Sequence, residues 1–138
     1  MNNPFAGIGF RAGNVVLAGR PNVGKSSLVN RLLDYKVSIV SEKPQTTRNV
    51  IRCVYNGEDF QIIFSDTPGI HLPKHKLGRT LVDAAVESLE EADLVCYVVE
   101  AEDRTVAPED EEILSVLGKV RTPVLLVVNK CDVVLDRK

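Results

Sequence analysis

GRPNVGKS, residues 19 to 26, is the stretch that decides the fold of this chain. It fits the pattern G-x-x-x-x-G-K-[ST], which predicts a phosphate-binding loop when it joins a strand to a helix. An apolar run at 15–18 (VVLA) precedes it and predicts a strand buried on both faces of a parallel sheet. The run 27–33 (SLVNRLL) follows, and its apolar residues at four-residue spacing predict a helix.

The residue types in this stretch predict how it binds phosphate. Gly19 and Gly24 allow turns that a side chain would hinder, so that successive N–H groups converge on phosphate oxygens. The N-terminus of the next helix adds free N–H groups and partial positive charge. Lys25 brings a full charge to the β- and γ-phosphates, and the Ser26 hydroxyl is a ligand suited to Mg²⁺. The residues predicted to contact the ligand are Gly19, Arg20, Pro21, Asn22, Val23, Gly24, Lys25, Ser26 and Ser27. The alternative is a glycine-containing turn with a surface lysine.

The length and composition indicate one ordinary globular domain. The chain has 138 residues, of which 44% are hydrophobic and 26% charged. Its formal net charge of -2 gives no electrostatic case for nucleic-acid binding by this segment. The three cysteines are widely spaced and odd in number, which favours free thiols in a reducing cytosol over disulfides or a zinc site.

The chain shows no targeting or membrane signal. Residues 1–13 lack the charged start and apolar core of a signal peptide and are expected to be a leader segment before a domain at 14–138. No apolar run approaches the roughly 20 residues that cross a bilayer. A cytoplasmic protein without a transmembrane segment is therefore expected.

The remaining pattern alternates strands and helices. Runs at 48–55 and 58–65 flank Asn56-Gly57, whose preference for positive φ predicts a tight antiparallel hairpin. A helix is expected from Leu77 to about Ala92, a strand at 94–99, a helix starting at Pro108 with acidic residues in its first turn, and a buried strand at 123–128. This order predicts an α/β, doubly wound, mostly parallel sheet with one antiparallel edge hairpin. Loops at the carboxyl ends of the parallel strands then share one rim, where ligands bind.

Two more loops are expected on that rim. In Asp66-Thr67-Pro68-Gly69, Asp66 would hold Mg²⁺ through water and Gly69 would offer its N–H to the γ-phosphate, although an ordinary turn has the same composition.

The other loop, Asn129-Lys130-Cys131-Asp132, identifies the base. The Asp132 carboxylate can accept the N1–H and N2–H of guanine, whereas adenine would leave this carboxylate unpaired at a cost of about 1 to 3 kcal/mol. GTP is therefore predicted over ATP. Asn129 would tie this loop to the phosphate loop, the Lys130 stem would lie against the purine, and Cys131 is expected to be buried. The alternative is a loop that caps a buried strand.

Together these motifs resemble the bacterial Era family of translation-factor-like P-loop GTPases. The resemblance is carried by residues 19–33, PQTTR at 44–48, DTPGI at 66–70, 86–114 and NKCD at 129–132. It implies a GTPase that assists maturation of the small ribosomal subunit by binding the 3′ region of 16S rRNA through a C-terminal KH domain. That domain and a fifth guanine motif after a further strand are not in this sequence, so a GTPase domain incomplete at its C-terminus is expected. The resemblance is compatible with peripheral association of the full-length protein at the inner membrane face.

The resemblance also assigns switch and catalytic roles. Gln45, Thr46 and Thr47 fall in the first switch, with Thr47 as Mg²⁺ ligand and Thr46 as its rival, and residues 66–76 form the second switch. Ile70 stands where many GTPases have a glutamine that orients water. The family suggests K⁺ held partly by Asn22 instead, which makes the expected catalytic set Asn22, Lys25, Thr47 and Gly69.

Three alternatives stay open at this stage. Because Ile70 cannot orient water, the chain could be a GTP-gated scaffold with little hydrolysis. It could also be a ribosome-assembly GTPase with tandem domains or a tRNA-modification GTPase.

His71 and His75 fit solvated loop positions better than an acid–base role. The strand at 123–128 would be an uncovered edge, from which self-association and weakened GTP binding are expected.

Overall fold

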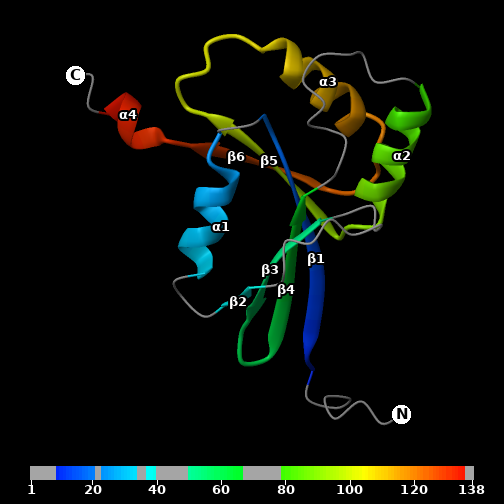
Figure 1. The fold of residues 1–138 in the computed structure, drawn as a ribbon, viewed down its shortest axis with the longest axis vertical. Helices are drawn as coiled ribbons and strands as arrows, with labels where there is room; N and C mark the ends of the chain where they lie inside the picture. The colour runs from blue at the N-terminus through cyan, green and yellow to red at the C-terminus, as the bar shows by residue number, and fades with distance from the viewer. Residues whose placement is uncertain (1–8, 21–22, 34–36, 40–49, 67–78, 136–138) are drawn as a thin grey trace.

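A computed structural model describes residues 9–20, 23–33, 37–39, 50–66 and 79–135 as an α/β domain built on one six-stranded sheet (Figure 1). The strand order is β2-β3-β4-β1-β5-β6. The strands are β1 Arg11–Ala18, β2 Val37–Ile39, β3 Val50–Asn56, β4 Phe60–Asp66, β5 Leu94–Glu100 and β6 Val124–Asn129. The helices are α1 Lys25–Leu33, α2 Arg79–Glu90, α3 Pro108–Leu117 and α4 Cys131–Leu135.

The sheet is mostly parallel, as the alternation of strands and helices predicts. β4, β1, β5 and β6 run parallel, while β3 is antiparallel to both β2 and β4. The expected α/β doubly wound class is confirmed. β2 lies between the first helix and the β3–β4 hairpin, where the sequence pattern indicates no strand, and it adds a short strand outside the hairpin.

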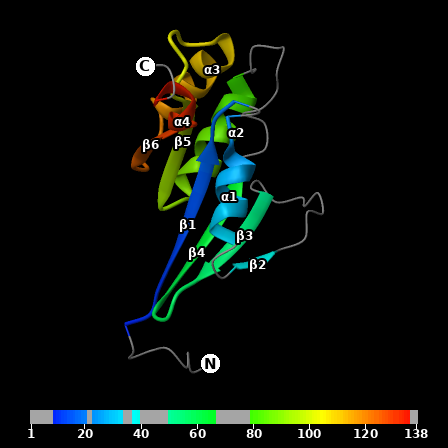
Figure 2. The same ribbon diagram turned by 90° about the vertical axis from the view of Figure 1, so that its left-hand side faces the viewer.

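Alternate residues of the central strands pack on opposite faces of the sheet. Val16 and Tyr97 belong to a buried cluster with Leu89 of α2 and Ile113 of α3. Leu17 belongs to a second cluster with Val29 of α1. Figure 2 shows α1 on one side of the sheet and α2 and α3 on the other. The two-residue side-chain period of a strand thus gives β1 two buried faces.

The β3–β4 hairpin forms, but the expected turn is wrong. Neither Asn56 nor Gly57 has positive φ in the described chain, where Lys130 is the one non-glycine residue that does. The turn instead closes through the Gly57 N–H, which donates to the Phe60 carbonyl at 2.8 Å. The Phe60 ring packs on Gly57 so closely that a Cβ would collide with it, and it stacks on Tyr55 at 5.9 Å between centroids. Gly57 therefore leaves room for the Phe60 ring and is not needed for positive φ.

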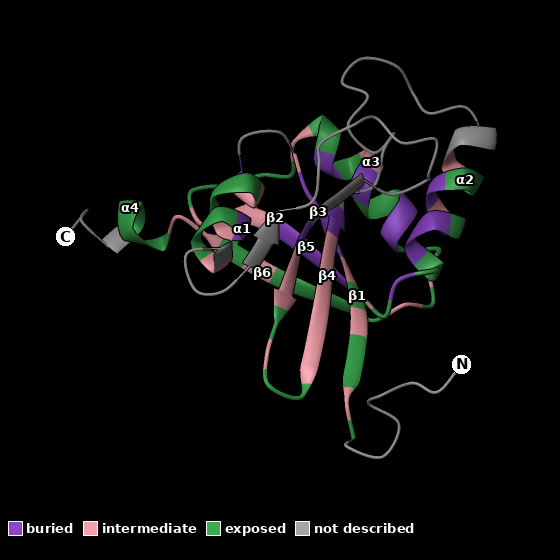
Figure 3. Cartoon of the chain, turned by 60° about the horizontal axis from the view of Figure 1, so that its bottom comes forward, coloured by how far each residue is buried: buried purple, intermediate pink, exposed green. Residues whose placement is uncertain are grey.

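β6 departs from the expectation of a buried strand. Four of its five apolar side chains are exposed, with Leu126 at 58% and Leu125 at 51% (Figure 3), whereas Val127 is partly buried and packs against the cluster of Leu17 and Val29. Its position at the end of the strand order confirms the expected edge. An all-apolar strand predicts burial only when both faces are covered.

Candidate nucleotide-binding site

The predicted phosphate loop, residues 19–26, leaves the buried end of β1 at Gly19. Gly19 has φ +150°, and a Cβ there would lie 2.6 Å from the Val98 carbonyl oxygen. Gly24 has φ +97°, and a Cβ there would overlap the Asn129 side-chain amide. Both positions therefore need glycine for conformation and for space. This is the backbone freedom that a phosphate-binding nest requires.

Lys25 starts α1 and reaches back across the loop. Its Nζ donates to the Gly19 carbonyl at 2.7 Å, and the Leu28 N–H donates to the Gly24 carbonyl at 2.8 Å. Ser26 and Ser27 follow in the first turn and are exposed. No acidic residue lies in that turn to neutralise the helix N-terminus. The loop thus fits an anionic ligand by its charge, its helix end and its glycines.

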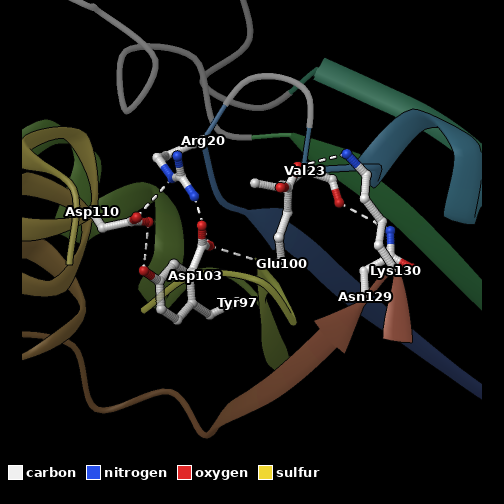
Figure 4. Close-up of polar contacts among 8 residues, drawn as sticks. All are labelled: Arg20, Val23, Tyr97, Glu100, Asp103, Asp110, Asn129 and Lys130. Atoms are coloured by element: carbon white, nitrogen blue, oxygen red, sulfur yellow. Dashed lines mark hydrogen bonds and ion pairs between the residues drawn. The ribbon is translucent and has the colours of Figure 1, made fainter. Parts of the chain in front are cut away.

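The predicted base loop, residues 129–132, follows β6 and lies against the phosphate loop. The Asn129 Nδ2 donates to the Val23 carbonyl at 2.9 Å, which confirms that Asn129 ties the two loops together (Figure 4). Lys130 has φ +59°, and its Nζ pairs with Glu100 Oε1 at 2.5 Å. Asp132 lies exposed in the first turn of α4. Cys131 is also exposed, so its expected burial is wrong.

Arg20 points away from the predicted phosphate cradle. Its Nη2 pairs with Asp103 Oδ2 at 2.6 Å and its Nε with Asp110 Oδ2 at 2.7 Å (Figure 4). The other Asp110 oxygen accepts the Tyr97 hydroxyl at 2.7 Å, and this contact is buried. The hydrogen bond to Asp103, with the charges of both carboxylates, raises the pKa of Arg20. The same hydrogen bond lowers the pKa of Asp103.

Tyr97 stays a hydrogen-bond donor in this arrangement. Burial raises the pKa of Tyr97 above its ordinary value of 10.0, and Asp110 raises it further. A neutral phenol donates a hydrogen bond to a neighbouring carboxylate, whereas an ionised phenolate would place a second negative charge beside it. Tyr97 therefore hydrogen-bonds one oxygen of Asp110 and Arg20 forms an ion pair with the other, while the Asp110 side chain is only 6% exposed.

The sequence motifs do not predict this group of residues. They place Asp110 in the first turn of a helix, where a carboxylate favours the helix dipole, and α3 confirms that position. One available signal is Tyr97, a hydroxyl-bearing residue in the middle of the apolar strand LVCYVV. A buried hydroxyl needs a partner, and the nearby acidic residues could supply one.

Several predicted site residues lie outside the described part of the chain. They are Pro21, Asn22, Gln45, Thr46, Thr47, Thr67, Pro68 and Gly69. Ile70 and the two loop histidines, His71 and His75, also lie outside the described residues. The backbone of Asp66 ends β4 beside Leu17 of β1, on the rim of the sheet where the phosphate loop begins. The roles predicted for these residues stay predictions.

Comparison with known proteins places this site in a family. The family described as 50S ribosome-binding GTPase matches residues 14–130. GTPase Era of Alkaliphilus oremlandii is 52% identical over 123 residues, which cover 89% of this chain and 41% of that protein. The expected resemblance to Era is confirmed by this similarity.

Two solved Era structures are also similar. A singly substituted Era of Aquifex aeolicus, bound to GDP·AlF4⁻, is 45% identical with a TM-score of 0.61, over 89% of this chain and 42% of that one. Era in complex with MgGDPNP and nucleotides 1506–1542 of 16S ribosomal RNA is 45% identical with a TM-score of 0.62, over the same shares. The chain thus spans about two-fifths of the length of these relatives. Within the described residues, no helix is both long and apolar enough to cross a membrane.

Proposed function

The chain belongs to the 50S ribosome-binding GTPase family, and on this premise we propose that it binds and hydrolyses GTP as a switch in maturation of the small ribosomal subunit in the cytoplasm. The observation that carries the proposal is the 2.9 Å contact between Asn129 Nδ2 and the Val23 carbonyl. It brings a predicted base-binding loop and a predicted phosphate-binding loop into direct contact, so that one nucleotide could reach both. Similarity to Era proteins supports the same conclusion.

The residues of the phosphate loop would bind and orient the phosphates. Lys25 would exchange its contact with the Gly19 carbonyl for phosphate oxygens, and the N-terminus of α1, which begins at Lys25, would add its partial positive charge. Mg²⁺, when bound, would neutralise negative charge on the phosphates. Ser26 would hold it directly, with Thr47, and Asp66 through water. The exposed Ser26 hydroxyl, in the first turn of the helix, is an oxygen donor of the kind this ion prefers.

Guanine selection is assigned to Asp132. Its carboxylate accepts two N–H groups of guanine, and replacement by an amide turns one acceptor into a donor. Asp132→Asn should therefore lose GDP binding and gain binding of xanthosine diphosphate, whose base carries a carbonyl in place of the 2-amino group. Titration calorimetry with GDP, ADP and xanthosine diphosphate measures this exchange. Equal binding of GDP and ADP by the unchanged protein would contradict the assignment.

Hydrolysis is proposed to depend on K⁺ held partly by Asn22. Ile70 cannot donate or accept a hydrogen bond, so it cannot orient water as glutamine does. Single-turnover GTP hydrolysis with Mg²⁺, in K⁺ and then in Na⁺ buffer, should be faster in K⁺, and Asn22→Ala should remove the difference. The same K⁺ response in Asn22→Ala would refute the role of Asn22. Negligible hydrolysis in both buffers would favour the second candidate, a GTP-gated scaffold, which Ile70 also permits.

The ribosomal role is proposed for the whole protein that carries this chain. The structure of Era with nucleotides 1506–1542 of 16S ribosomal RNA supports an RNA partner of this kind. The net charge of -2 gives this segment no electrostatic case for RNA binding of its own, so the RNA contact is assigned to a KH domain beyond it. Binding of a 16S rRNA 3′ fragment to the intact protein should be tighter with a non-hydrolysable GTP analogue than with GDP. Equal binding in the two states would refute nucleotide gating.

A further inference from the structure

We propose that Arg20 is a positioning residue that holds the phosphate loop in register with the base loop, acting through Asp103 and Asp110. The role assigned to Arg20 rests on the proposed nucleotide function and adds to it. Arg20 directly follows Gly19, so its side chain anchors the loop where the loop leaves β1. Its guanidinium is occupied by two carboxylates rather than directed at a phosphate.

The first step is the anchor in α3. Asp110 lies in the first turn of α3 and is buried; its Oδ1 accepts the Tyr97 hydroxyl, and its Oδ2 forms the ion pair with Arg20 Nε at 2.7 Å. A buried carboxylate with both oxygens paired is fixed in orientation, and loss of one partner leaves buried charge unpaired. Arg20 is thus held from α3, which itself packs on the sheet through Ile113.

The second step is the turn that connects Arg20 to the base loop. This bridging turn, Glu100–Asp103, is closed by the Asp103 N–H donating to the Glu100 carbonyl and by the Glu100 N–H donating to Asp103 Oδ2, both at 3.1 Å. Asp103 Oδ2 is the same oxygen that pairs with Arg20. One carboxylate therefore shapes the bridging turn and binds the phosphate-loop residue.

The third step closes the ring at the base loop. The Ala101 N–H donates to the Asn129 carbonyl at 2.9 Å, and Glu100 pairs with Lys130 at 2.5 Å. Asn129 then reaches the carbonyl of Val23, which lies within the phosphate loop. The loop is thus held at Arg20 and at Val23 by one connected set of contacts, and this set passes through the base loop. Figure 4 shows the side chains of this set between β1, β5, α3 and β6.

This arrangement predicts that Arg20 affects nucleotide affinity in folded protein. A nucleotide contacts both loops at once, so any loss of their relative placement weakens binding. Binding of fluorescently labelled GDP to the intact protein tests this, with urea unfolding curves recorded in parallel to confirm that every variant is folded. Arg20→Gln should raise the Kd roughly tenfold, which corresponds to about 1.4 kcal/mol. Arg20→Lys, which keeps the charge beside Asp103, should recover part of the loss.

A double-mutant cycle separates positioning from general damage. Asp103→Asn should also raise the Kd, and the double variant Arg20→Gln/Asp103→Asn should bind no more weakly than Arg20→Gln alone, because both act through one contact. Glu111→Gln is the control, since it removes an exposed charge from the same turn of α3 as Asp110. If Arg20→Gln does not fold, Asp103→Asn alone must still raise the Kd at least threefold, because its solvent-accessible site tolerates an amide.

Two results would overturn the role of Arg20. One is an Arg20→Gln variant whose Kd for GDP equals that of the Glu111→Gln control while its free energy of unfolding falls. The contacts of Arg20 would then stabilise the fold without positioning the loops. The other is a double variant whose fold-increase in Kd equals the product of the fold-increases of Arg20→Gln and Asp103→Asn, because the two residues would then act independently. Wild-type protein that binds no labelled GDP would instead refute the proposed nucleotide function. The two failures are therefore distinguishable.

Discussion

At the scale of single residues, the site depends on glycines that no other residue can replace. Gly24 combines φ +97° with a backbone position that leaves no room for a Cβ beside Asn129. We predict that Gly24→Ala weakens GDP binding by at least tenfold, because it displaces the Asn129 amide from the Val23 carbonyl as well as straining the loop. Calorimetric titration with GDP measures the loss.

Gly118 is the matched control for this substitution. It caps α3 with φ -66° and ψ -14°, and a Cβ there would lie 3.4 Å from the nearest atom, the Leu114 carbonyl oxygen. Gly118→Ala should leave GDP binding unchanged and alter the free energy of unfolding by less than about 1 kcal/mol. If both substitutions affected GDP binding equally, the special role of Gly24 would be disproved.

Asp103 gives the molecule a predicted pH response. Its hydrogen bond with Arg20 lowers the pKa of Asp103 below the ordinary value of 3.8, so the unfolded chain takes up the proton first as the pH falls. The contribution of the Asp103–Arg20 contact to the free energy of unfolding is therefore fully present above about pH 5, and it is lost as the pH falls through the lowered pKa of Asp103. The difference in free energy of unfolding between wild type and Asp103→Asn should be constant from about pH 8 to 5.5 and shrink below about pH 4. A difference that grows on acidification would contradict this sign.

Residue motifs explain why part of the site could be predicted from sequence. Gly19, Lys25 and Asn129 fall in short patterns whose spacing encodes local geometry, and the structure brings them together. The partners of Arg20 could not be predicted in this way. Asp103 and Asp110 lie far along the chain from Arg20, and only the pairing of β1 with β5 and the packing of α3 bring them near.

At the scale of elements, β6 shows the limit of inferring burial from composition. Its sequence VLLVVN matches a strand covered on both faces, yet its apolar side chains other than Val127 are exposed at the edge of the sheet. A run of apolar residues predicts a buried strand because other elements normally cover both faces of such a strand. The prediction for the β3–β4 turn also failed, since neither Asn56 nor Gly57 adopts the positive φ that the Asn-Gly pair favours, and the Phe60 ring lies against Gly57 instead.

The exposed strand predicts self-association of a chain of these 138 residues. An apolar edge strand offers unpaired N–H and C=O groups to a second copy. Leu126→Lys, at the most exposed position of β6, should lower the weight-average mass found by sedimentation at high concentration. Val106→Lys is the control, because Val106 is 56% exposed but lies in a loop with no strand edge. Equal masses for both variants would show that β6 does not mediate the association.

At the scale of the whole molecule, the site joins parts of the fold that are distant in sequence. β1 leads into the phosphate loop, β5 leads into the bridging turn, and β6 carries the base loop, while α3 holds Arg20 from the opposite side. These strands are neighbours in the order β1-β5-β6, so their carboxyl ends converge on one rim. A ligand that bridges the rim therefore adds contacts between three strands that the core already packs together.

This arrangement predicts a large and selective effect of ligand on folding. A ligand bound only by the folded state, at a concentration about 100 times its Kd, adds about 2.7 kcal/mol to the free energy of unfolding. GDP should do so, whereas ADP at the same concentration should not, because adenine does not offer Asp132 the two N–H groups that guanine does. Urea unfolding of the intact protein with each nucleotide measures the difference, and Gly24→Ala should abolish the effect of GDP. Equal stabilisation by GDP and ADP would mean that the phosphate loop alone binds the ligand, without the base loop that Asn129 joins to it.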